Sequence, residues 1–134
     1  MDYILDTHVA IWALENDKKL SKEAKEIIDD IDNNIYFSAL SVMEIVIKHK
    51  KNPDIMDWEG KEFYEDCLNA GFYTMPLKPK HAICLDDLKL KEGNYANGDP
   101  FDRGLIAQAK QEKMILLSHD KIMENYDEPC IIRV

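Results

Sequence analysis

Five short runs of apolar residues, separated by helical patterns, constrain the fold of this chain more than any other feature. Each run is continuously apolar, which is typical of strands that helices cover on both faces. Strands that alternate with helices connect through right-handed crossovers into a parallel sheet. We therefore predict the α/β class, with a central parallel sheet of about five short strands covered by helices on both faces. The runs are residues 3–5, 35–37, 72–75, 114–117 and 131–134.

Helix signals fill the segments between these runs. Ser21 is the expected N-cap of a second helix that ends near residue 31, and Ser41 is expected to open a third that ends near residue 50. Further helices are expected from about residue 59, from Pro79, and from about Phe101 into the fourth strand.

Length, composition and charge limit the class of protein. The 134 residues fit one domain, residues 1–134, and no apolar run is long enough to cross a bilayer. Because the first predicted strand begins at residue 3, we expect no targeting segment, no membrane association and a cytoplasmic protein. Three cysteines with apolar neighbours predict reduced, buried thiols. The net charge of −9 argues against nonspecific binding to polyanions unless metal ions or local charge reverse the field at one site.

Acidic residues recur where the predicted strands end or helices begin. Asp6 follows the first strand and Asp120 the fourth, so both are expected at the carboxyl edge of the sheet, where open α/β folds bind ligands. Glu44 and Asp102 lie in the first turns of predicted helices, and their side chains can point to the same edge. Carboxylates that converge in a dry site repel one another unless a hard cation binds them. Mg²⁺ or Mn²⁺ is the expected ion.

A plainer interpretation is that each acid is a helix cap. Ser41 and Glu44 have the spacing of a capping box, and Asp99 precedes a proline, as an N-cap residue often does. Asp102, however, precedes Ile106 at helical spacing, which places it on the buried side of its helix. The joint placement of the acids at one edge favours a metal site over independent caps.

Basic and aromatic residues give weaker signals. The cluster at residues 48–51 is interpreted as a solvated helix end. Arg103 is a candidate for contacting phosphate, and an ion pair with a neighbouring acid remains an equal alternative. Four aromatic residues are interpreted as core rather than as platforms for bases, namely Trp12, Phe63, Tyr64 and Phe101.

Four segments of the chain carry a resemblance to a known family: Ile4-Leu5-Asp6-Thr7-His8, the helix around Glu44, Asp99-Pro100-Phe101-Asp102-Arg103-Gly104-Leu105-Ile106-Ala107-Gln108-Ala109, and Leu116-Leu117-Ser118-His119-Asp120. In these segments the chain resembles the PIN-domain ribonucleases, and among them the VapC-type toxins of bacterial and archaeal toxin–antitoxin pairs. The resemblance spans essentially the whole chain and implies a single PIN domain with a three-layer α/β/α fold. It departs at Ser118, where threonine is usual, and at Gly104, where leucine is commoner.

The resemblance also implies a function. It implies a metal-dependent endoribonuclease that cleaves RNA by metal-activated water, forms a homodimer, and is blocked by a small antitoxin that enters the acidic site. Thr7 and Ser118 would orient the ligand carboxylates or a bound water, and Arg103 would contact substrate. A PIN-like binding scaffold without catalysis is the alternative. The implied Mg²⁺ or Mn²⁺ ligands are Asp6, Glu44, Asp102 and Asp120, with Asp99 as an additional nearby acid.

Overall fold

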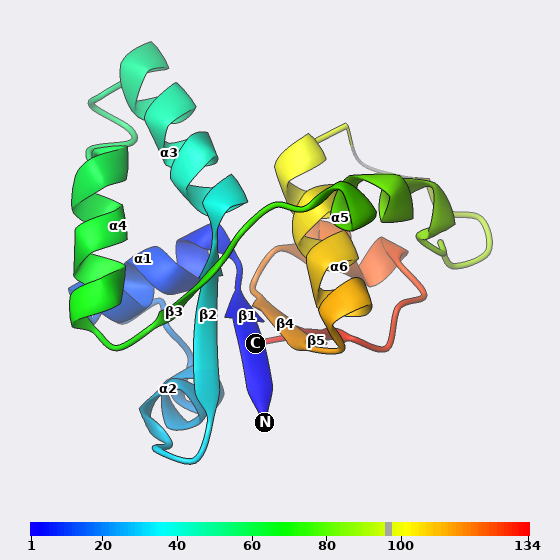
Figure 1. Ribbon diagram of the computed structural model, residues 1–134, viewed down its shortest axis with the longest axis horizontal. Helices are drawn as coiled ribbons and strands as arrows, with labels where there is room; N and C mark the ends of the chain where they lie inside the picture. The colour runs from blue at the N-terminus through cyan, green and yellow to red at the C-terminus, as the bar shows by residue number, and fades with distance from the viewer. Residues whose placement is uncertain (96–97) are drawn as a thin grey trace.

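A five-stranded, fully parallel sheet forms the centre of the molecule (Figure 1). The computed structural model describes residues 1–95 and 98–134. The strand order is β3-β2-β1-β4-β5, and each neighbouring pair is parallel. This confirms the predicted fold class. The strands are β1 (Asp2–Leu5), β2 (Asn34–Ser38), β3 (Tyr73–Met75), β4 (Ile115–Ser118) and β5 (Ile131–Arg133).

Helices connect the strands as the sequence predicts. Ser21 caps α2, because its hydroxyl accepts a hydrogen bond from the Ala24 amide at 3.1 Å. The helices are α1 (Thr7–Glu15), α2 (Lys22–Asp29), α3 (Ala39–Lys51), α4 (Gly60–Asn69), α5 (Pro79–Cys84) and α6 (Pro100–Glu112), with the short 3-10 turns η1 (Leu85–Asp87) and η2 (Lys121–Asn125). Among the described residues, none of the helices has the length and apolar character needed to cross a membrane.

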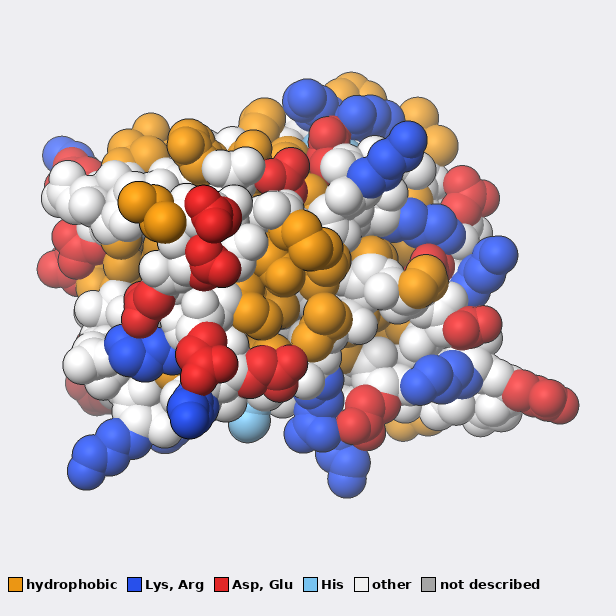
Figure 2. Space-filling view, turned by 90° about the horizontal axis from the view of Figure 1, so that it is seen from below, with side chains coloured by type: hydrophobic (Ala, Val, Ile, Leu, Met, Phe, Trp, Pro, Cys, Tyr) orange, Lys and Arg blue, Asp and Glu red, His pale blue; other side chains and the backbone are white. Residues whose placement is uncertain are grey.

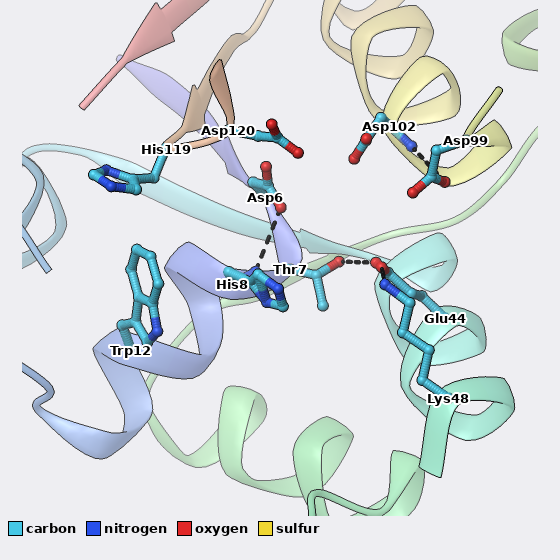
Figure 3. A pocket seen from close by; sticks show the side chains of 10 residues that line it. All are labelled: Asp6, Thr7, His8, Trp12, Glu44, Lys48, Asp99, Asp102, His119 and Asp120. Carbon is cyan, nitrogen blue, oxygen red and sulfur yellow. Dashed lines mark hydrogen bonds and ion pairs between the residues drawn. The ribbon is translucent and has the colours of Figure 1, made fainter. Parts of the chain in front are cut away.

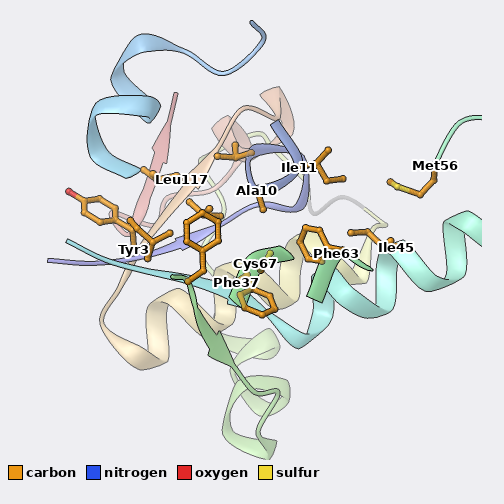
Figure 4. Close-up of a cluster of buried hydrophobic side chains, with 13 residues drawn as sticks. Tyr3, Ala10, Ile11, Phe37, Ile45, Met56, Phe63, Cys67 and Leu117 are labelled. Carbon is orange, nitrogen blue, oxygen red and sulfur yellow. The ribbon is translucent and has the colours of Figure 1, made fainter. Parts of the chain in front are cut away.

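Two hydrophobic clusters cover the faces of the sheet. Tyr3 and Leu5 of β1 face one cluster, which includes Phe37 and Phe63 and lies against α1, α3 and α4 (Figure 4). Ile4, between them in sequence, faces the other cluster, which lies against α6. Adjacent residues of one strand are thus buried on opposite faces, as the continuously apolar runs require.

Some packing differs from the sequence expectation. Phe63 is fully buried, but Tyr64 on the same helix is 40% exposed, so it is not a core residue. The cysteines are all free; Cys67 and Cys84 are buried, whereas Cys130 is partly exposed.

The start of α3 is a correction. The N-cap is Ser38, the last residue of β2, whose hydroxyl accepts a hydrogen bond from the Leu40 amide at 2.9 Å. Ser41 lies inside the helix, so the capping box expected between Ser41 and Glu44 does not form. The strand passes directly into the helix without a loop, and this shifts the helix start toward the N-terminus. Glu44 is therefore available for contacts other than capping.

Gly104 explains how α3 and α6 approach each other. A Cβ atom at this position would lie 2.5 Å from Cδ1 of Leu40, so the Leu40 side chain occupies the space that a larger residue would need. The departure from leucine at position 104 therefore has a packing reason. The close approach also brings the Glu44 and Asp102 helices together.

Candidate active site

The carboxyl ends of β1 and β4 hold the first two acids. Asp6 follows β1 and caps α1, and Asp120 caps η2 just beyond β4. Ser118 joins them: its buried hydroxyl donates to Asp6 Oδ2 at 2.5 Å and accepts from the Asp120 amide at 3.1 Å. The chain builds the sheet outward from β1 on one side and then from β4 on the other. The pair therefore lies at the topological switch point, where open α/β sheets bind ligands.

The third acid, Glu44, reaches the same place from α3. Its side chain is buried, and Thr7 Oγ1 donates to Glu44 Oε1 at 2.6 Å. Thr7 Oγ1 also lies 2.8 Å from the buried Ser41 hydroxyl. The other carboxylate oxygen, Oε2, forms an ion pair with Lys48, one turn further along α3. Glu44 is thus held at both oxygens.

The amino end of α6 supplies two more acids. Asp99 is the N-cap residue, and its Oδ1 accepts from the amides of Phe101 at 2.9 Å and Asp102 at 3.4 Å. Asp102 lies in the first turn and is buried, so its carboxylate is held between the helix and the sheet edge.

These side chains surround one pocket of about 140 Å³, which has room for a cation and several waters of about 30 Å³ each. Figure 3 shows the carboxylates of Asp6, Asp102 and Asp120 pointing toward a common space. Lys48 lies on one side of these acids and Trp12 on another. The lining residues are Asp6, Thr7, His8, Trp12, Glu44, Lys48, Asp99, Asp102, His119 and Asp120.

Burial and like charge raise the pKa of two of the acids. Burial is the main cause at Asp6, and it outweighs the hydrogen bond from Ser118. The pKa of Asp102 rises to about 7, first because of burial and then because of repulsion from Asp99, Asp6, Asp120 and Glu44. At Lys48 burial acts to lower the pKa, but the hydrogen bond and attraction of Glu44 outweigh it and the pKa is raised.

The donor chemistry of the pocket fits a hard divalent cation. Five carboxylates line it, and oxygen ligands are those that Mg²⁺ and Mn²⁺ prefer. Among the described residues, no three potential ligands already stand close enough to enclose an ion. Lys48, paired with Glu44, neutralises one of the acids.

Comparison with known proteins identifies the domain. A family model of the PIN domain matches residues 3–129. The chain belongs to the PIN-domain family. The PIN domain shares its fold with a chain in the crystal structure of VapBC2 from Rickettsia felis bound to a DNA fragment from their promoter. The TM-score is 0.67 at 14% sequence identity, and the match covers 100% of this chain and 98% of that chain. No curated protein matched the sequence.

The site residues expected from the sequence lie together with one exception. The five acids and Thr7 line the pocket of the PIN domain, and Ser118 contacts two of the acids from beneath. Arg103 does not line the pocket. Its Nε is buried, with no hydrogen-bond partner among the described residues, and no ion pair of Arg103 with a neighbouring acid is found there. The phosphate contact expected of Arg103 stays a prediction.

The capping interpretation is correct for part of the acid set. Asp6, Asp99 and Asp120 each accept a hydrogen bond from a backbone amide at the start of a helix or 3-10 turn. The N-cap residues of α3 and α6 are Ser38 and Asp99, so Glu44 and Asp102 are not N-cap residues. Capping therefore orients three acids at the pocket, and the two interpretations are not exclusive.

Four pocket residues were missed by sequence reasoning. Lys48 was interpreted as part of a solvated helix end, yet it pairs with Glu44 inside the pocket. Trp12 was interpreted as core, yet it lines the pocket together with His8 and His119. The spacing of Lys48 four residues after Glu44 was the available signal for the ion pair.

Proposed function

We propose that this PIN domain is a metal-dependent endoribonuclease, a hydrolase that cleaves the phosphodiester bonds of RNA. The observation that carries the proposal is the convergence of Asp6, Glu44, Asp102 and Asp120 on one pocket at the switch point of the sheet. Acids assembled at a cost to stability, with two raised pKa values, are typical of a functional site rather than a structural one.

We assign Mg²⁺ or Mn²⁺ as the cofactor. The metal-ligand residues we propose are Asp6, Glu44, Asp102 and Asp120, with Asp99 beside them. When bound, such an ion supplies positive charge to the phosphate and lowers the pKa of a water molecule. The number of lining carboxylates exceeds what structural pairing requires, and this supports the assignment.

The chain's own residues position these groups. Ser118 holds Asp6 Oδ2, and Thr7 holds Glu44 Oε1, which fixes the direction of both carboxylates toward the pocket. Lys48 is the cationic side chain that lines the pocket, and it can attract a phosphate oxygen in an otherwise acidic site. A local cation of this kind partly offsets the overall charge of −9 for a polyanionic substrate.

We further propose that the PIN domain is the toxin of a toxin–antitoxin pair in the cytoplasm. The VapC-like segments that contain Asp6, Asp102 and Asp120 support this, as does the fold shared with a chain of the VapBC2 complex. A homodimer is supported by exposed apolar side chains on α3, where Met43 is 45%, Val46 50% and Ile47 48% exposed. A small antitoxin with a basic side chain would complement the acidic pocket.

The decisive experiment is cleavage of a mixed pool of structured RNAs by purified protein in Mg²⁺, in Mn²⁺ and in chelator. The Asp6→Asn variant, purified in parallel, controls for contaminating nuclease. The expected result is metal-dependent cutting by the wild type and none by the variant. A folded protein that is free of inhibitor and cuts nothing under any metal would instead support the scaffold alternative.

A further inference from the structure

Three rings form a wall beside the acids, consisting of His8, Trp12 and His119. The ring centroids of His8 and Trp12 lie 6.1 Å apart with the planes inclined by 26°. Trp12 and His119 meet edge to face, with centroids 5.2 Å apart and planes at 74°. All three rings line the same pocket as the carboxylates. We refer to them as the ring wall.

The fold holds the ring wall in place. His8 and Trp12 are four residues apart on α1, so they lie on the same side of the helix. Trp12 also packs against the hydrophobic core, which anchors its indole. His119 Nδ1 lies 2.6 Å from the carbonyl oxygen of Val134, which fixes that imidazole. A rigid aromatic surface of this kind loses little entropy when a flat group stacks on it.

Core packing alone does not account for these rings. His8 and His119 are exposed, and Trp12 is only partly buried although it touches the core. A tryptophan kept at the mouth of a polar pocket exposes apolar surface to water, and covering it is favourable. The wall therefore has a surface that a flat, partly apolar ligand group can cover.

The position of the wall relative to the acids selects the ligand. In Figure 3, Trp12 and His119 lie on one side of Asp6 and Asp120, and Lys48 lies on the other side beyond Glu44. His8 is two residues after Asp6 and donates its backbone amide to Asp6 Oδ1. A group bound at the acids is thus next to the rings, and a ligand that carries both a phosphate and a flat ring can occupy both places.

We propose that the ring wall is a subsite for an unpaired nucleobase next to the phosphate held at the acids. The proposal rests on the proposed nuclease function and assigns these three rings to binding a base of the RNA. Paired bases are stacked within a helix and cannot reach the wall, whereas unpaired bases can turn out and stack on aromatic side chains. Stacking is tolerant of sequence, so the subsite selects for an unpaired base rather than for one particular nucleobase.

Fluorescence measures stacking without relying on cleavage. The chain has two tryptophans, so Trp58→Phe leaves Trp12 as the only indole reporter. Trp58 lies outside the pocket and donates to Glu15. Stopped-flow mixing in Mg²⁺ with a randomised single-stranded RNA octamer should quench Trp12 before any cleavage. A duplex RNA and an abasic octamer of the same length and charge should not quench it.

Two substitutions then separate stacking from packing. Trp12→Phe keeps an aromatic face and Trp12→Leu keeps only apolar bulk. For cleavage of single-stranded RNA, the leucine variant should raise KM by about tenfold, within the range measured for base–aromatic stacking, with kcat little changed. The phenylalanine variant should stay close to the wild type. Circular dichroism checks that both variants are folded.

The outcomes distinguish this proposal from the nuclease proposal. Quenching by single-stranded RNA without any metal-dependent cleavage would support the base subsite and overturn the nuclease function. Cleavage without quenching, or with equal KM for the leucine and phenylalanine variants, would overturn the subsite and leave the nuclease intact. Equal quenching by the abasic octamer would also overturn it, because charge alone would then explain the signal.

Discussion

The two ends of α6 carry acids in opposite electrostatic situations. Asp102 lies in the first turn, where the helix dipole stabilises negative charge, yet its pKa is raised to about 7. Glu112 is the last residue of the helix, where the dipole disfavours negative charge, yet its pKa is lowered to about 2. The main causes at Glu112 are hydrogen bonds from Lys80 and then from His81. Burial and then repulsion at Asp102, and hydrogen bonds at Glu112, therefore outweigh the helix dipole.

The two ends of α6 also differ in the charge of the groups that surround each acid. At the carboxyl end every partner is complementary: Lys80 lies 2.8 Å and buried His81 lies 2.9 Å from Glu112 Oε1. His81 Nδ1 accepts a hydrogen bond from the Lys78 amide, so the ring proton is on Nε2. Nε2 therefore donates a hydrogen bond to Glu112 Oε1. At the amino end, Asp102 faces other acids. One end pairs an acid with basic side chains, and the other gathers several acids around a pocket where a cation can bind.

The largest test of this contrast is removal of the charge at Asp102. Asp102→Asn should abolish metal-dependent cleavage and, in chelator at pH 8, raise the free energy of unfolding by about 2 kcal/mol, because burial and repulsion no longer oppose the native state. Urea denaturation measures the stability. Asp54→Asn, at an exposed position outside the pocket, is the matched control. A loss of stability at position 102 would mean that the acid is a structural cap.

The second test is the pH dependence of stability without metal. The native pKa of Asp102, about 7, exceeds its ordinary 3.8, so the native state retains a proton that the unfolded chain loses between these values. Stability should therefore rise as pH falls from 8 to about 5. The native pKa of Glu112 is below its ordinary 4.5, so its contribution is present above that value and is lost as pH falls toward 2.

Chemical denaturation in chelator across this pH range should give a maximum in the free energy of unfolding near pH 5. Asp102→Asn should reduce the fall in stability above pH 5 and leave the fall below pH 5 unchanged. A profile that rises steadily from pH 5 to 8 in the wild type would refute the account of Asp102.

A smaller effect of opposite sign is expected at the other end of α6. Glu112→Gln keeps the size of the side chain but removes its charge, and should destabilise the protein by about 1–2 kcal/mol at pH 7. The half-exposed Lys80 limits the loss, because its ion pair is screened by solvent. Cleavage should not change. Stabilisation by this substitution would break the contrast between the two ends.

The smallest predicted effect concerns Lys48. Lys48→Met should lower stability in chelator by about 0.5–1 kcal/mol, because Glu44 loses its partner and repulsion among the acids grows. It should also tighten Mn²⁺ binding, since the ion no longer competes with the ammonium for Glu44. Calorimetry with Mn²⁺ measures this. The control is Lys50→Met, because Lys50 is an exposed lysine of the same helix that does not line the pocket. Weaker Mn²⁺ binding in Lys48→Met would show that the lysine assists the metal.

Much of the fold follows from the sequence because burial leaves a direct pattern. Both faces of the sheet are covered, so the strands had to be continuously apolar, and all five lie within one residue of their predicted bounds. Surface charge leaves no such pattern. Figure 2 shows acidic, basic and hydrophobic side chains mixed on the face at the amino ends of the strands, away from the pocket. The net charge of −9 therefore does not locate the site.

The sequence predicts a flexible loop at residues 92–98. Positions 96 and 97 of this segment lie outside the described residues. Asp99 directly after this segment is described, as the N-cap of α6.

The sequence by itself determined the parallel sheet and the place of Asp6, Glu44, Asp102 and Asp120 at one edge, because parallel strands end together and the acids follow those ends. The tertiary structure decided which side chains surround these acids. The Ser38 cap and the ion pair of Lys48 with Glu44 are local contacts of α3. That Lys48 and Trp12 share one pocket with the acids, however, depends on contacts between segments far apart in the chain. Helical periodicity gives the face of a helix, but only packing determines what lies opposite that face, and hence the direction in which a pKa moves.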